Sequence, residues 1–259
     1  MALFTDTTVV TLDDLLLYEA TLAEIASPHG INVETKIRLA SSAMEDKLML
    51  WLLDAGVSDP QFAMRRQIGL STVVVTPTMR RWLSFESLSR FYAEAHNIQL
   101  NPRFQAKWVE YQQESEKARD LVVRDGVGIV YHPLPAPSAP QVTVGAGTLA
   151  AQSLFVQTAW VDASGAESGV SAVNGLLLND NSGITVAMTE AGLQIPTTAM
   201  GWNVYLSSSQ TDPALQNSAP LALGSNWGLP AGGVVTGPAP TGGQPPDFYI
   251  PVGNRIRRG

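Results

Sequence analysis

The sequence divides at residues 133–140, Pro133-Leu134-Pro135-Ala136-Pro137-Ser138-Ala139-Pro140. Four prolines in eight residues favour an extended backbone near polyproline II, which is typical of a stiff linker between two modules. Before this stretch the apolar residues recur with a helical period, and after it they alternate as in β-strands. We therefore predict a multidomain α-then-β protein, with a helical domain in residues 1–132 and an all-β domain in residues 141–235.

The helical domain is expected to be a bundle of about four helices. Thr11 is a good N-cap, and two acids follow it in the first turn, where negative charge meets the positive end of the helix dipole. Asn101-Pro102 supplies an N-cap and a first-turn proline, and Gly126 a stop, so the last helix has the strongest signals. The predicted helices cover about residues 11–27, 32–55, 78–96 and 102–125.

The all-β domain is expected to be an immunoglobulin-like β-sandwich of the immunoglobulin or fibronectin type III kind. Six short β-rich runs fall within about 95 residues, separated by turn-forming residues, as such folds require. There are no cysteines, so no inter-sheet disulfide can form, and Trp160, Trp202 and Trp227 are expected to fill the core. The runs are 141–144, 154–161, 168–178, 184–188, 202–207 and 221–227.

Residues 236–259 are rich in Pro and Gly and are expected to form an extended C-terminal arm. The arm holds Phe248-Tyr249-Ile250 and ends in Arg255-Ile256-Arg257-Arg258. An exposed aromatic segment beside charge is a liability unless it docks on a partner. This pattern favours a protein-binding arm, while a basic terminus that only keeps the chain in solution is the alternative.

Charge and composition exclude several classes of protein. The net charge of −7 argues against a general nucleic-acid binder, and the absence of cysteine rules out thiolate zinc sites and thiol nucleophiles. Residues 1–132 hold 13 Lys and Arg against 17 Asp and Glu, whereas residues 133–254 hold six acids and no base. That step supports a domain boundary. Met1–Val10 lacks the features of a signal peptide, and Leu48–Leu53 is too short to span a membrane.

No catalytic, cofactor-binding or metal site is predicted, and we do not expect an enzyme. Gly145-Ala146-Gly147-Thr148-Leu149-Ala150 matches a dinucleotide-binding pattern, but a strand pattern resumes near Ser153 and leaves no room for the helix such a site needs. We interpret it as a glycine turn between two strands. Residues 179–183 are interpreted as a hairpin turn. The histidines, each beside a predicted break in helical structure, are His29, His96 and His132.

The helical part resembles the head–tail adaptor (connector or head-completion) proteins of tailed bacteriophages. The stretches that carry the resemblance are residues 8–15, 79–88, 92–95 and 99–111. The last of them, with Asn101, Arg103-Phe104 and Lys107-Trp108, is similar to the run that opens the final long helix of such connectors. In the β domain, residues 154–168 and 201–205 resemble two edges of a fibronectin-type domain of the kind appended to phage structural proteins.

The adaptor resemblance implies a structural virion protein without enzymatic activity or cofactor. Such adaptors form a ring, usually of twelve copies, which links the portal protein to the tail or tail-completion proteins. The genome passes through the ring without being bound specifically, and no membrane is involved. The resemblance places the chain in the neck of the virion after assembly in the host cytoplasm. It implies portal docking through the arm residues Phe248, Tyr249, Ile250, Arg255, Ile256, Arg257 and Arg258.

Two other functions remain open from the sequence. The chain can be a neck, collar or tail decoration protein whose β-sandwich faces outward. It can also be a binding module that recognises a glycan or a host surface through the β-sandwich, with the helices as an oligomerisation base.

Overall fold

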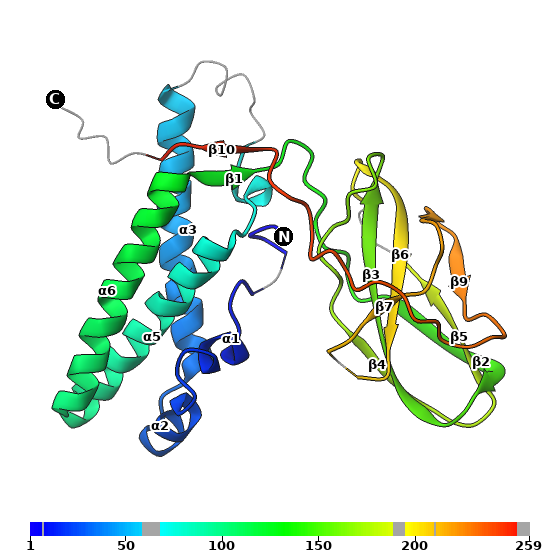
Figure 1. Ribbon diagram of the computed structural model, residues 1–259, viewed down its shortest axis with the longest axis horizontal. Coiled ribbons are helices and arrows are strands. Elements are labelled where there is room, and N and C mark those ends of the chain that lie inside the picture. Colours follow the sequence, from blue (N-terminus) through cyan, green and yellow to red (C-terminus); the bar gives the residue numbers. More distant parts are fainter. Residues whose placement is uncertain (7, 59–67, 189–194, 210, 253–259) are drawn as a thin grey trace. The chain divides into compact units, whose positions relative to one another are not determined.

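The computed structural model describes residues 1–6, 8–58, 68–188, 195–209 and 211–252, and it has helices in its N-terminal half and antiparallel sheets in its C-terminal half (Figure 1). The chain forms two compact units. The helical unit comprises Thr8–Tyr131 and Pro246–Gly259, and the β unit comprises Met1–Thr7 and His132–Pro245. The chain therefore passes between the units three times, whereas the sequence predicted one linker.

Five α-helices lie among the described residues of the helical unit: α1 (Leu12–Leu16), α2 (Leu22–His29), α3 (Val33–Ser58), α5 (Pro77–Gln99) and α6 (Pro102–Asp125). A short 3-10 helix, η1 (Leu70–Thr72), precedes α5. The core lies where α5 packs against α3 and α6. Its largest fully buried side chains include Trp82, Tyr92 and Phe91 of α5.

The capping signals of the sequence operate as predicted. Thr11 and Asp14 form a capping box at α1, and Asn101 accepts a hydrogen bond from the Arg103 amide at the start of α6. Gly30 ends α2 with φ of 63°, a left-handed conformation that glycine adopts without strain. Gly56, however, does not end the second predicted helix, because α3 continues to Ser58.

The first predicted helix is wrong in one respect, because residues 11–27 do not form a single helix. The helix breaks between α1 and α2, and the turn between them brings Glu19 to the hydroxyl of Tyr111 at 3.0 Å. This contact joins residues 92 positions apart. The apolar pattern within residues 11–27 therefore could not predict this contact or the break in the helix.

The β unit contains β2 (Gln141–Leu149), β3 (Gln152–Asp162), β4 (Asn174–Leu178), β5 (Ser182–Ala187), β6 (Ala199–Ser207), β7 (Ala214–Leu215), β8 (Leu221–Ala222) and β9 (Asn226–Gly228). One sheet has the order β4-β3-β6-β7, with β8 also paired to β6, and the other has the order β2-β5-β9. All of these pairs are antiparallel. Alternate residues of strands from both sheets point into one apolar core.

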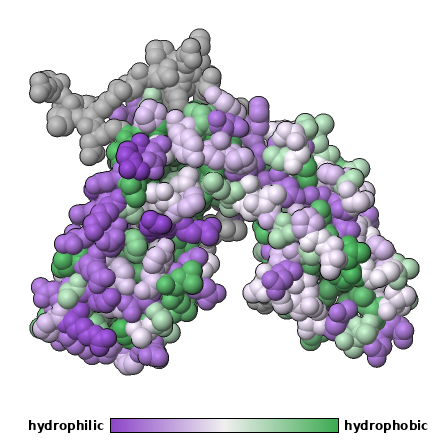
Figure 2. Space-filling view, in the orientation of Figure 1, coloured by the Kyte–Doolittle hydropathy of each residue, from purple (hydrophilic) through white to green (hydrophobic). Residues whose placement is uncertain are grey.

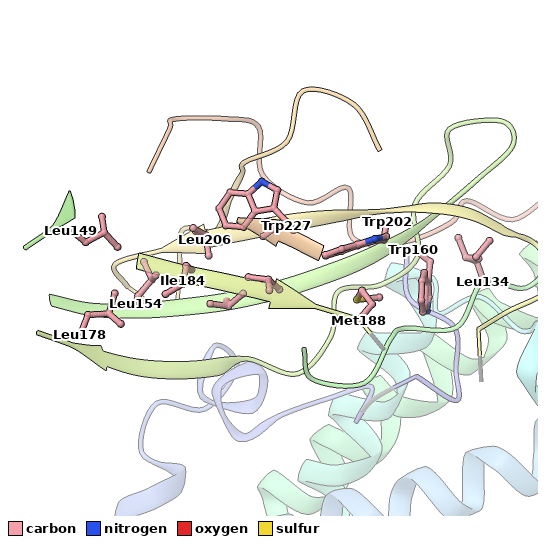
Figure 3. Close-up of a cluster of buried hydrophobic side chains, with 14 residues drawn as sticks. Leu134, Leu149, Leu154, Trp160, Leu178, Ile184, Met188, Trp202, Leu206 and Trp227 are labelled. Carbon is pink, nitrogen blue, oxygen red and sulfur yellow. The ribbon is translucent and has the colours of Figure 1, made fainter. Parts of the chain in front are cut away.

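The three tryptophans expected in this core are buried there. Trp202 is fully buried, and Trp160 and Trp227 nearly so. Figure 3 shows Trp160 and Trp202 in the same cluster as Leu134. Leu134 belongs to the predicted linker, so part of that linker is a component of the β core.

The proline-rich segment 133–140 contains no helix or strand, but it packs on the β unit along part of its length. The Leu134 amide donates to Oε1 of Gln244 at 2.7 Å, and the Ala136 amide donates to Oδ1 of Asp6 at 2.9 Å. Burial raises the pKa of Asp6, although its hydrogen bonds from Ala136 and Leu3 act in the opposite direction. The segment therefore differs from the stiff spacer between two modules that its composition predicts, because part of it is fixed to the β unit.

The two predicted turns near β2 also differ in the structure. Gly145 and Gly147 lie inside β2, where the register with β5 shifts at a bulge, and a Cβ on Gly147 would lie 2.5 Å from Cα of Gly183. The glycine is required for this close approach of two backbones. Residues 179–181 join β4 to β5, but these strands belong to different sheets, so the turn is not a hairpin.

The first half of the predicted arm is bound to the β unit. Just before the arm, Gln216 exchanges two hydrogen bonds with the backbone of Val235, each 2.9 Å long. Within the arm, the carbonyl of Pro238 accepts a hydrogen bond from the Leu215 amide at 3.0 Å. The Thr241 amide donates to Oε2 of the buried Glu167 at 3.3 Å, and the other carboxylate oxygen of Glu167 accepts from Asn203 and Tyr205 at 2.5 Å each. Residues 235–244 thus form part of the folded β unit.

Candidate docking site

The aromatic part of the predicted arm forms a strand of the helical unit. Phe248–Ile250 is β10, and it pairs antiparallel with β1 (Val127–Ile129), which follows α6 directly. The register places Gly128 opposite Tyr249. Figure 1 shows β10 beside β1 at the C-terminal end of α6. Phe248, Tyr249 and Ile250 therefore already have a docking partner within their own chain.

Asp247 anchors the start of β10. Its amide donates to the carbonyl of Ile129 at 2.9 Å, and its carboxylate accepts from the amide of Tyr131 at 2.7 Å. The rings of Phe248 and Tyr131 stack with centroids 4.6 Å apart. Backbone and side-chain contacts therefore both fix β10 to the segment that contains β1 and Tyr131.

Two glycines of the helical unit make room for β10. A Cβ on Gly126 would lie 2.7 Å from the Ile250 carbonyl oxygen, and one on Gly128 would lie 2.9 Å from Cβ of Pro246. Gly126 also has φ of 89°, which disfavours any residue with a Cβ. The sequence predicts that Phe248–Ile250 docks but does not identify β1 as its partner, although the pattern Gly126-Val127-Gly128-Ile129 is a signal of close backbone approach within a strand.

β1 forms backbone hydrogen bonds along both of its edges. Its second edge bonds to residues 72–74, because the Val74 amide donates to Gly128 at 2.9 Å and the Val130 amide donates to Thr72 at 3.0 Å. Among the described residues β10 pairs only with β1, and the side chain of Tyr249 is half exposed. Arg255, Ile256, Arg257 and Arg258 lie outside the described residues. The last described residue, Val252, is buried in the helical unit.

A cluster of polar side chains surrounds Glu19, apart from the β1–β10 site. Its carboxylate accepts hydrogen bonds from the hydroxyls of Thr21 at 2.9 Å and Tyr111 at 3.0 Å, and Nζ of Lys107 lies 3.5 Å away. Burial raises the pKa of Glu19, but the hydrogen bonds from Thr21 and Tyr111 and the charge of Lys107 together lower it below its usual value. Burial, together with the hydrogen bond to Glu19 and its charge, raises the pKa of Tyr111. The arrangement fastens the α1–α2 turn to α6.

Replacing Glu19 by Gln should remove an acid-sensitive part of the stability. A depressed native pKa gives stability that is complete above the ordinary glutamate pKa of about 4.3 and is lost as the pH falls through the lower native pKa. The free energy of unfolding of wild type should therefore exceed that of E19Q by a constant amount between about pH 7 and about pH 5, and by less below about pH 4. Urea denaturation at several pH values measures this difference. E24Q, which removes an exposed carboxylate of α2, is the control, and an equal pH profile for both variants would contradict the assignment.

A pocket of about 280 Å³ lies where α3, α5 and α6 meet, and the sequence did not indicate it. Lys47, Trp82, Glu86, Trp108 and Arg119 contribute to its walls. The Lys47 ammonium lies 5.3 Å from the ring centre of Trp82. Oε2 of Glu86 accepts from Ser115, and Arg90 donates to its Oε1. The charges on the walls are thus of both signs, with no excess that would select an anion or a cation.

The residues considered for catalysis are not brought together. His29 lies near Gln99, and His96 stacks on Trp108 with Nδ1 3.2 Å from the Asn101 carbonyl oxygen. In the described part of the chain, no three His, Asp or Glu residues are grouped so that they could hold a metal ion. Within the same residues, no helix combines the length and apolar character needed to cross a membrane.

Comparison with known proteins adds no identification. No protein-family model matches the chain, and no curated protein matches its sequence.

Proposed function

We propose that the chain is a head–tail adaptor of a tailed bacteriophage, which forms a ring between portal and tail and surrounds the DNA channel. The observation that carries the proposal is the place of β10. Because β10 is a strand of the helical unit, the basic cluster of Arg255, Arg257 and Arg258 follows a strand that is paired to the part of the chain resembling adaptors. The docking segment is then residues 253–259, with Phe248, Tyr249 and Ile250 as its anchor.

Other features support the same function. The stretches that resemble adaptors, residues 79–88 and 99–111, lie in α5 and α6, which pack closely as an antiparallel pair. The net charge of −7 suits a channel wall that lets DNA pass without binding its phosphates. Repeating a modest docking contact around a ring raises the total affinity without a tight single contact.

The β unit, in this proposal, is an immunoglobulin-like sandwich whose strands are permuted. The immunoglobulin fold orders its strands G-F-C in one sheet and A-B-E in the other. The orders β4-β3-β6 and β9-β5-β2 match these if β2, β3 and β4 correspond to E, F and G, and β5 and β6 to B and C. The turn at residues 179–181, where Asn181 has φ of 60°, would then join G to B.

Portal binding tests the proposal. Wild type should co-sediment with purified rings of the portal protein of the same phage, and the triple substitution R255A/R257A/R258A should weaken binding at least about tenfold, since each charge-assisted contact contributes about 1.5 kcal/mol or more. R80A/R81A, which removes two exposed charges at the start of α5, is the matched control and should bind normally. Unchanged binding of the triple variant would reject the docking segment. Absence of the wild-type chain from portal complexes and from the neck of the virion would reject the function.

A further inference from the structure

The pocket between α3, α5 and α6 has a buried hydroxyl without a partner in its wall. Ser89 of α5 is 8% exposed, and its hydroxyl forms no hydrogen bond with any residue that the structure describes. Ser84 and Ser87 of the same helix are also buried, but each donates to the carbonyl four residues earlier. Leaving a buried hydroxyl unbonded is unfavourable. Ser89 therefore indicates that a polar molecule from outside the chain enters this pocket.

Two charges on the walls also lack an opposite partner. Among the described residues, no carboxylate lies within ion-pair distance of Lys47, whose side chain is half-buried. Glu116 of α6 likewise forms no ion pair in the described part of the chain. Glu86, by contrast, is already neutralised, because Arg90 donates to its Oε1 at 2.9 and 3.1 Å and Ser115 donates to its Oε2 at 2.9 Å. The two unpaired charges are thus of opposite sign.

Cations gather at one end of the pocket. The hydrogen bond between Ser115 and Glu86 sets the register of the antiparallel helices α5 and α6. One turn along, Trp82 lies level with Arg119, because the two are equally far from that bond. The Lys47 ammonium lies 5.3 Å from the ring centre of Trp82, so it is at the same end. Arg119 pairs with the exposed aspartate that follows it, which leaves most of its five N–H donors available. This end suits a ligand carboxylate.

The remainder of the pocket suits a ligand cation followed by a longer side chain. Glu116 lies next to Ser115, in the middle of the pocket. Beyond them Ser89 lies level with Gln112, and the half-buried ring of Trp108 lies one turn farther along α6. Figure 2 shows mainly hydrophilic residues over α6 on the visible face, so a wholly apolar ligand has no matching surface there. The walls therefore present cations, then a carboxylate, then hydrogen-bonding and aromatic side chains.

We propose that this pocket binds a free α-amino acid. The ligand carboxylate accepts hydrogen bonds from Lys47 and Arg119, and its ammonium donates to Glu116. The ligand side chain lies between Ser89 and Trp108. A zwitterion is the class of ligand that uses both signs of charge, and a volume of about 280 Å³ suits a ligand smaller than a drug-sized molecule. This binding site goes beyond the adaptor function and does not depend on it.

Calorimetric titration of the full chain with L-glutamine and with L-phenylalanine tests the proposal. The amide of the first can bond to Ser89 and Gln112, and the ring of the second can stack on Trp108. At least one of them should bind with one equivalent per chain. Its N-acetyl derivative lacks the ammonium and its amide derivative lacks the carboxylate, so each should bind at least about tenfold more weakly. No saturable heat with either amino acid at about 10 mM, or equal affinity for the derivatives, would overturn the proposal.

Substitutions test where the ligand lies. K47M keeps the apolar stem beside Trp82 but removes the ammonium. It should weaken binding of the amino acid at least about tenfold and leave binding of the amide derivative unchanged, because that derivative has no carboxylate. S89A should also weaken binding, with an unchanged urea midpoint, since it breaks no hydrogen bond among the described residues. R38M, which removes an exposed cation elsewhere on α3, is the matched control. Wild-type affinity in both K47M and S89A would overturn the site, whether or not the chain binds portal rings.

Discussion

Truncation of the chain before Asp247 is expected to destabilise the helical unit by roughly 3–6 kcal/mol, because two buried apolar side chains are lost at about 1.5–3 kcal/mol each. The two are Ile250 and Val252, which are 3% and 5% exposed. The truncation also removes the partner of β1 and the carboxylate that caps the Tyr131 amide. Unfolding in urea, followed by the helical circular dichroism signal, measures the loss.

The control is truncation after Val252, which keeps β10 and its anchor. This shorter deletion should leave the urea midpoint unchanged, because it removes only residues 253–259, which include the three arginines. Equal midpoints for the two truncations would show that β10 contributes nothing to the helical unit. Portal binding should therefore be tested with the truncation after Val252. A chain that ends before Asp247 would lose binding either because the helical unit unfolds or because the docking segment is gone, and the two causes could not be separated.

Replacement of Trp202 by Ala should destabilise the β unit by about 3–5 kcal/mol, the usual cost of removing a buried indole from a core. Trp202 is fully buried, and its Nε1 donates to the Ala222 carbonyl at 3.1 Å. The substitution leaves a cavity in the core. It also removes the hydrogen bond from Trp202 of β6 to the carbonyl of Ala222 in β8. Amide hydrogen exchange in β3 and β6 should accelerate strongly.

W202F serves as the comparison, because it keeps most of the ring volume and loses only the hydrogen bond and part of the packing. W202F should lower the free energy of unfolding of the β unit clearly less than W202A does. The helical unit has its own core, so amide exchange in α5 should stay at the wild-type rate in both variants. Acceleration in α5 as large as in β3 would show that the two units unfold as one.

The helices that the sequence predicts best are those with strong local signals. For α6, Asn101, Pro102 and Gly126 lie at the expected ends, and the stripe of Phe104, Tyr111 and Val122 is buried as expected. Caps and helical periods depend on residues within about four positions of one another, so a sequence displays them directly. The break between α1 and α2 depends on Glu19 and Tyr111, and no local pattern predicts it.

The candidate docking site also depends on contacts between residues far apart in the chain, which the sequence does not display. Composition alone indicates that an aromatic segment near residue 248 should dock, but not on what. Its partner, β1, begins immediately after α6, and the bond between Asp247 and Tyr131 joins residues 116 positions apart. The proline-rich stretch predicts a stiff extended linker, because proline restricts the local backbone, whereas the burial of Leu134 depends on a core assembled from distant strands.

By itself the sequence determined the division into a helical and a β half, most helix ends and the identity of the core tryptophans. These follow from conformational preferences and apolar periodicity, which act over a few neighbouring residues. The tertiary structure alone decided which strands pair and that Phe248–Ile250 returns to the helical unit. Each of these depends on packing between residues far apart in the chain, where the free energy of burial outweighs local preference.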